Sequence, residues 1–104
     1  MDSEPKPFRG KPPRLQSISS PRWTSLYFVT FCAWNRAPLL ACETVHNAFL
    51  EGAGKLASAG NAVGRYVIMP EHIHVFISVG PQGRLGLAVK CLRETITKEL
   101  RRQQ

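Results

Sequence analysis

Residues 65–79 read RYVIMPEHIHVFISV, which is two runs of β-branched and aromatic residues on either side of Met-Pro-Glu. Such residues favour strands, and a proline between two runs favours a tight turn. We therefore expect one strand over residues 65–69 and another over residues 74–79, joined as a hairpin. The second strand can begin as early as Glu71 or His72.

The segments on both sides of this hairpin have strand and helix patterns of their own. Residues 26–32 read LYFVTFC, a strand-like run that Asn-Arg-Ala-Pro at 35–38 brings to an end. Apolar residues recur at helical spacing over residues 43–59 and again over residues 85–100. The expected order is β-α-β-β-α, which is the ferredoxin-like order with its last strand missing. We predict an α+β fold in which two helices cover one face of an antiparallel sheet.

The chain is small and strongly basic. It has 104 residues, enough for one domain, and a net charge of +7. Residues 1–25 hold five Lys/Arg against two Asp/Glu, residues 26–83 hold three against three, and residues 84–104 hold six against two. A charge concentrated at the two ends favours a polyanionic partner, either nucleic acid or an anionic membrane surface.

The first 22 residues differ in composition from the rest. They contain five of the eight prolines and almost no apolar residues. Because proline removes backbone donors and blocks helices, we expect residues 1–22 to be a disordered basic arm, and residues 23–104 to be the folded domain. The arm can be a solubilising leader or a contact to DNA.

The apolar runs, the cysteine spacing and the missing motifs exclude several classes of protein. No apolar run has the roughly 20 residues of a membrane helix, and the polar N-terminus does not read as a signal peptide. The three cysteines are widely spaced, so we expect free thiols in the cytoplasm. The sequence lacks a nucleophile elbow, a phosphate-binding loop and a dinucleotide-binding turn. We expect no membrane partner and no small-molecule cofactor.

The residues that carry chemistry are His72 and His74. Alternate side chains of a strand share a face, so the two imidazoles project side by side while Ile73 and Val75 point toward the helices. Two neutral imidazoles in this arrangement can bind a divalent metal with ligands from elsewhere. The competing interpretation is a pair of solvated or hydrogen-bonded histidines. His46, near the start of the first helix, is expected at the surface.

Residues 66–77, YVIMPEHIHVFI, closely resemble the HUH motif of the tyrosine transposases that move single-stranded insertion sequences. The nearest branch is the REP-associated tyrosine transposases. Residues 27–31 and 35–40 are similar to that family's first strand and following loop, and residues 85–100 to its second helix. The resemblance covers roughly residues 23–100, and its most specific part is Met69 to His74.

The resemblance implies a metal-assisted reaction on single-stranded DNA. In the family, the two histidines hold Mg²⁺ or Mn²⁺ on the scissile phosphate, and a tyrosine on a later helix attacks to form a 5′-phosphotyrosine before strand transfer. The proteins generally work as dimers on hairpins near the element's ends. Carried over to this chain, His72 and His74 are the metal ligands.

The chain departs from the family at the nucleophile. Only 30 residues follow His74 and none is a tyrosine, so we expect the last strand and the catalytic helix to be missing. Of the two tyrosines, Tyr66 precedes the hairpin and is a candidate nucleophile, with packing or base stacking as the competing role. Glu71 is a candidate further ligand or base. A sheet without its last strand can recruit a second copy, which predicts a homodimer.

Four basic residues are candidate DNA contacts: Arg36, Lys90, Arg93 and Arg101. The last three line up on one face of the second helix, where a merely solvated face is the alternative. Three functions follow: a transposase acting on single-stranded DNA, a non-catalytic module that binds single strands, and a remnant of a mobile element. In the module, Trp23, Trp34 or Tyr66 can stack on bases.

Overall fold

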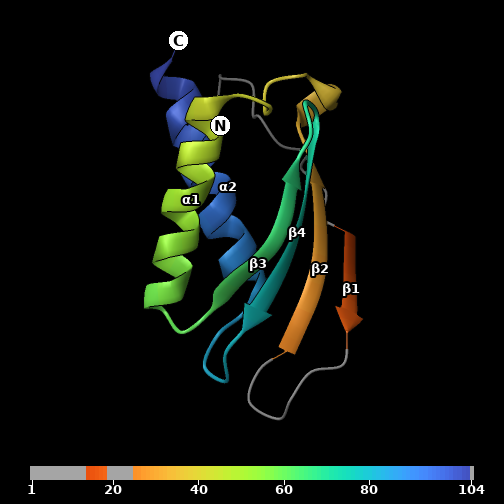
Figure 1. Ribbon diagram of the computed structural model, residues 1–104, viewed down its shortest axis with the longest axis vertical. Coiled ribbons are helices and arrows are strands. Elements are labelled where there is room, and N and C mark those ends of the chain that lie inside the picture. Colours follow the sequence, from red (N-terminus) through yellow and green to blue (C-terminus); the bar gives the residue numbers. More distant parts are fainter. Residues whose placement is uncertain (1–13, 19–24, 104) are drawn as a thin grey trace, which may run out of the picture.

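The computed structural model describes residues 14–18 and 25–103. Two helices lie on one face of an antiparallel sheet (Figure 1). The sheet has four strands in the order β1-β2-β4-β3. The elements are β1 Arg14–Ile18, β2 Ser25–Cys32, the short 3₁₀ helix η1 Trp34–Arg36, α1 Glu43–Ser58, β3 Ala62–Ile68, β4 His72–Val79 and α2 Leu85–Arg102.

From β2 onward the order is β-α-β-β-α, so the predicted α+β class and ferredoxin-like arrangement are confirmed. Both helices begin at the predicted residues, and each ends within two residues of the predicted end. β3 begins at Ala62, earlier than expected. The reason is the turn at Gly60, whose φ of 85° lets the chain leave α1 and enter the strand at once. No described helix combines the length and apolar character that a membrane span requires.

The prediction of a disordered arm over residues 1–22 does not hold for Arg14–Ile18. This segment is β1, which pairs with β2 in antiparallel register. In a ferredoxin-like sheet the last strand lies beside the first, and β1 occupies that edge instead. The backbone groups of β2 thereby find partners, which is the physical reason for pairing a segment with so few apolar residues. The rest of the arm lies outside the described residues, and a homodimer stays a prediction.

The core lies between the sheet and the two helices. Ile73, Val75 and Ile77 of β4 are fully buried, as the alternation predicted. Phe49 is the largest fully buried side chain. The other buried apolar residues of the sheet and the helices include Val29, Phe31, Val45, Leu56, Val89, Leu92 and Ile96. The face of the sheet that points away from the helices therefore contributes little to the core.

The helices pack closely where α1 carries Gly52. A Cβ atom at this position would lie 2.7 Å from the Thr95 hydroxyl and 3.1 Å from a methyl group of Leu92. Only a residue without a side chain permits this approach. The contact holds α2 against the helix that covers β3.

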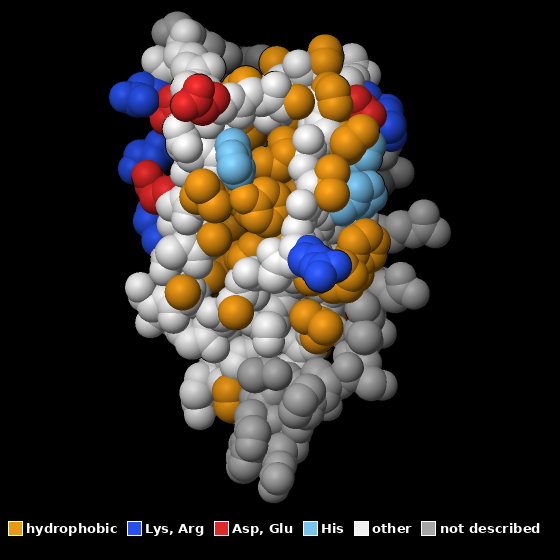
Figure 2. Space-filling view, viewed as in Figure 1, with side chains coloured by type: hydrophobic (Ala, Val, Ile, Leu, Met, Phe, Trp, Pro, Cys, Tyr) orange, Lys and Arg blue, Asp and Glu red, His pale blue; other side chains and the backbone are white. Residues whose placement is uncertain are grey.

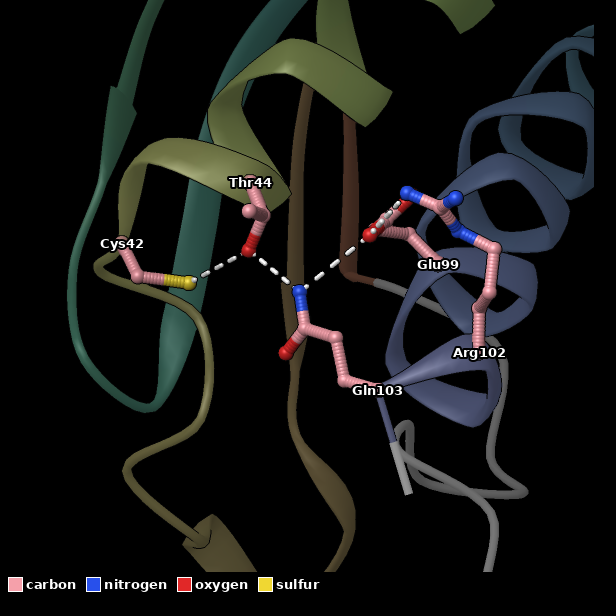
Figure 3. Close-up of polar contacts among 5 residues, drawn as sticks. All are labelled: Cys42, Thr44, Glu99, Arg102 and Gln103. Carbon is pink, nitrogen blue, oxygen red and sulfur yellow. Dashed lines mark hydrogen bonds and ion pairs between the residues drawn. The ribbon is translucent and has the colours of Figure 1, made fainter.

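A second contact joins the end of α2 to the start of α1 (Figure 3). The amide of Gln103 donates hydrogen bonds to the hydroxyl of Thr44 and to the carboxylate of Glu99. Arg102 also pairs with Glu99, at 3.1 Å. Hydrogen bonds from Arg102 and then Gln103 lower the pKa of Glu99. The helix layer is thus connected at both its middle and its end.

β3 contains a β-bulge, because its register with β4 shifts between Val63 and Tyr66. Both residues pack toward the helices although they are three positions apart. In a regular strand they would point to opposite faces, and the extra residue corrects this. Gly64 and Arg65 lie between them and together oppose the single residue Phe76.

Candidate functional site

The face of the sheet that no described helix covers, here called the open face, carries both predicted metal ligands. His72 and His74 are neighbours on it, with ring centroids 4.6 Å apart in an edge-to-face arrangement. Each lies directly opposite a residue of β2: Cys32 for His72 and Thr30 for His74. The predicted side-by-side projection is therefore confirmed.

Each imidazole is held by one ring nitrogen. His74 Nδ1 lies 2.9 Å from the hydroxyl oxygen of Thr30, and His72 Nδ1 lies 3.1 Å from a carboxylate oxygen of Glu71. A carboxylate accepts hydrogen bonds, so His72 donates from Nδ1, and Nε2 is the ring nitrogen left to face a metal. Metal-binding histidines show this same arrangement, in which a partner fixes one nitrogen and the other binds the metal.

The charge state of His74 suits a metal ligand. Burial, and then the neighbouring His72, lower the pKa of His74 from its ordinary value. The lowered pKa favours the neutral ring, which is the form that coordinates metals.

Glu71 and Arg36 lie at the rim of this pair. Glu71 precedes β4, so strand alternation does not direct its side chain, and its carboxylate reaches both His72 and the Arg36 guanidinium, the latter at 3.5 Å. Glu71, a candidate ligand or base, is the hydrogen-bond partner of His72 in this structure.

Arg36 is delivered by the loop after β2. Asn35 and Arg36 have φ of 55° and 51°, a left-handed conformation that is costly for residues other than glycine. Two backbone hydrogen bonds tie this loop to the turn of the hairpin: Ala33 N–H to Glu71 O at 2.7 Å and Leu40 N–H to Pro70 O at 2.9 Å. These bonds keep Arg36 beside the histidine pair.

The donor set fits a metal ion only in part. Within the described residues, no group of three or more His, Cys, Asp or Glu side chains is placed to hold one. His72 and His74 would supply two nitrogens, and water or phosphate oxygens would complete the coordination. Imidazole suits transition metals better than Mg²⁺, which prefers oxygen, so the pair favours Mn²⁺ of the two implied ions. Once bound, the ion would polarise a phosphate oxygen.

Both tyrosines lie on the opposite face of the sheet. Tyr27 is opposite Ile77 in register, and Tyr66 packs its ring on Phe49 with centroids 4.5 Å apart. The Tyr66 hydroxyl forms a 2.6 Å hydrogen bond with His46 Nε2. The structure therefore does not bring the candidate nucleophile to the histidine pair.

His46, expected at the surface, is half-buried. Its hydrogen bond with the hydroxyl of Tyr66, which projects from the neighbouring strand β3, draws the ring inward. Figure 2 shows apolar side chains gathered between α1 and β3, with histidine side chains at two separate places on this side.

The basic residues of α2 are also apart from the histidines. Lys90 and Arg101 are exposed and Arg93 is half-buried, where burial lowers the pKa of its guanidinium. All three lie in the helix layer, so the sheet separates them from the open face. Of the four predicted DNA contacts, Arg36 alone joins the site.

The comparisons with known proteins add no relative. No protein-family model matches the chain, and no curated protein matches its sequence. The assignment of a function therefore rests on the residues and their geometry.

Thr30 was not among the predicted site residues, because it lies 44 positions from the histidine it holds. We expect Thr30→Val to weaken Mn²⁺ binding about 10- to 100-fold, because the hydroxyl that orients His74 is lost while the shape is kept. Calorimetric titration with MnCl₂ measures this affinity. Thr44→Val, an exposed threonine in α1, is the matched control and leaves it unchanged. An unaltered affinity in Thr30→Val would show that Thr30 does not support the site.

Proposed function

We propose that this chain binds single-stranded DNA through its open face, with a divalent metal on His72 and His74 engaging a phosphate. The observation that carries the proposal is the pair of imidazoles on one uncovered face, each held at Nδ1 by a neighbouring side chain. The resemblance of residues 66–77 to the HUH motif supports the same metal and the same substrate.

Charge supports a polyanionic ligand at this face. Arg36 is placed at the rim of the histidine pair, and the chain as a whole carries +7. Positive groups beside a metal attract the phosphate backbone, and this attraction weakens with salt. The three cysteines are free thiols, which supports the cytoplasm as the place of action.

We propose that the chain binds single-stranded DNA but does not cleave it with a tyrosine of its own. Formation of a phosphotyrosine needs a hydroxyl that reaches the metal-bound phosphate, and Tyr27 and Tyr66 both face the helices. The non-catalytic module is therefore favoured over a transposase that uses either of these tyrosines as its nucleophile.

The test is the affinity for a labelled single-stranded hairpin with and without MnCl₂ over a range of salt concentrations. We expect binding to require the metal and to fall with salt, with a log–log slope of about −0.7 for each phosphate contacted. A duplex of the same sequence, which hides its bases, is the control and binds more weakly.

Two outcomes of this experiment would contradict the proposal. Binding that is insensitive to both a chelator and salt would show that neither the metal nor phosphate contacts contribute to it. A covalent adduct on a denaturing gel, lost in Tyr66→Phe or Tyr27→Phe, would show that a tyrosine reaches the phosphate and that the chain cleaves DNA.

A further inference from the structure

The open face has a hollow directly beside His74. Its volume is about 410 Å³, which is within the range of ligand pockets. The residues that line it come from β2, β3 and β4 and include no acid: Phe28, Arg65, Tyr66, Val67, His74 and Phe76. The ring of Tyr66 packs on Phe49 on the helix side, so the aromatic walls are those of Phe28, His74 and Phe76.

The walls of the hollow are aromatic and apolar. Phe28 stacks on His74 with ring planes 7° apart and centroids 5.6 Å apart, and Phe76 leans on Phe28 with centroids 5.0 Å apart. Val67 lies opposite His74 and is 53% exposed. These rings lie outside the core, on a face that no described helix covers. Planar ligands can therefore stack on them.

The bulge in β3 brings a cation to the same hollow. Gly64 and Arg65 both oppose Phe76, and a Cβ atom at Gly64 would already lie 3.4 Å from the Cβ of Phe76. Arg65 is exposed and lines the hollow. A bulge is a known means of redirecting a side chain, and here it combines a guanidinium with two aromatic rings.

We propose that this hollow is a subsite for one nucleobase of the bound strand, an inference that rests on the proposed function. The base stacks on Phe28 and Phe76, and Arg65 contacts an adjoining phosphate. Because His74 belongs both to the hollow and to the metal pair, the stacked base is next to the metal-bound phosphate. Aromatic rings with an arginine and no acid match the stacked bases and negative backbone of a single strand.

The test uses the whole chain and a single-stranded oligonucleotide with one 5-iodouracil, which forms photo-crosslinks to aromatic side chains on which it stacks. We expect cross-linked peptides that contain Phe28 or Phe76. Phe76→Leu should lower the affinity about 5- to 100-fold, because one stacking platform is lost. Leu50→Ala removes an exposed apolar side chain of α1, on the helix side of the sheet, and is the control that leaves the affinity unchanged.

A second variant keeps the test valid if Phe76→Leu does not fold. Arg65→Gln changes an exposed side chain, so folding is retained, and the salt slope should become shallower by about 0.7. Unchanged affinity and slope in Arg65→Gln, with cross-links at Trp34 and metal-dependent binding intact, would overturn the subsite alone. Failure of the unmodified chain to bind the strand at all would overturn the proposed function and the subsite with it.

Discussion

The double variant His72→Ala/His74→Ala loses Mn²⁺ binding by more than about 100-fold, because both nitrogen donors of the site disappear. The fold should persist, since the two rings lie on the open face and not in the core. Each substitution gives up one hydrogen bond, to Glu71 or to Thr30, worth about 1 kcal/mol of stability. Calorimetric titration and the electron paramagnetic resonance signal of free Mn²⁺ both measure the loss.

The third histidine provides the matched control for this experiment. His46 lies on the helix side of the sheet, where it is bonded to Tyr66. His46→Ala should therefore leave the Mn²⁺ affinity unchanged. If the double variant still binds Mn²⁺ as tightly as the unmodified chain, the metal site is elsewhere and the proposed function loses its central observation.

Phe49→Ala should destabilise the protein by about 3–5 kcal/mol, the usual cost of removing a fully buried aromatic side chain. Phe49 belongs to α1, has no exposed surface and packs its ring on that of Tyr66 in β3. Domains of this size are stable by only about 5–15 kcal/mol, so the loss is a large share of the total. The melting temperature should fall by more than about 12 °C.

Urea unfolding at equilibrium, followed by circular dichroism, measures this change. The adjacent residue supplies the control, because Leu50 is 45% exposed and its replacement by alanine should cost less than about 1 kcal/mol. A loss below about 1 kcal/mol in Phe49→Ala would mean that α1 does not pack on the sheet through this residue.

Much of the fold could be predicted from local patterns. The period of apolar residues over 43–59 and 85–100 placed both helices, and the alternation over 72–79 separated the two histidines from the buried side of β4. β1 could not be found this way, because it is held by pairing with β2 and has no apolar pattern of its own.

Part of the candidate site could likewise be predicted from a local pattern, and part depends on contacts between strands. His72 and His74 share a face because successive side chains of one strand alternate. The histidine pair could therefore be predicted without knowing which strand lies beside β4. The roles of Thr30 and Glu71 depend on cross-strand register and on the loop geometry before β4. The separation of Tyr66 from the histidines depends on the register of β3 with β4, which its bulge corrects.

The α+β class, the two helices, the hairpin and the shared face of His72 and His74 could all be predicted from the amino-acid sequence. These features follow from periodicities within single segments. The residues that support the histidines, the position of the aromatic hollow and the side that the tyrosines face depend on how the strands pair. Strand register brings together residues as far apart in the sequence as Thr30 and His74. Register depends on backbone hydrogen bonds between strands, which all residue types can form, so the local sequence pattern does not predict it.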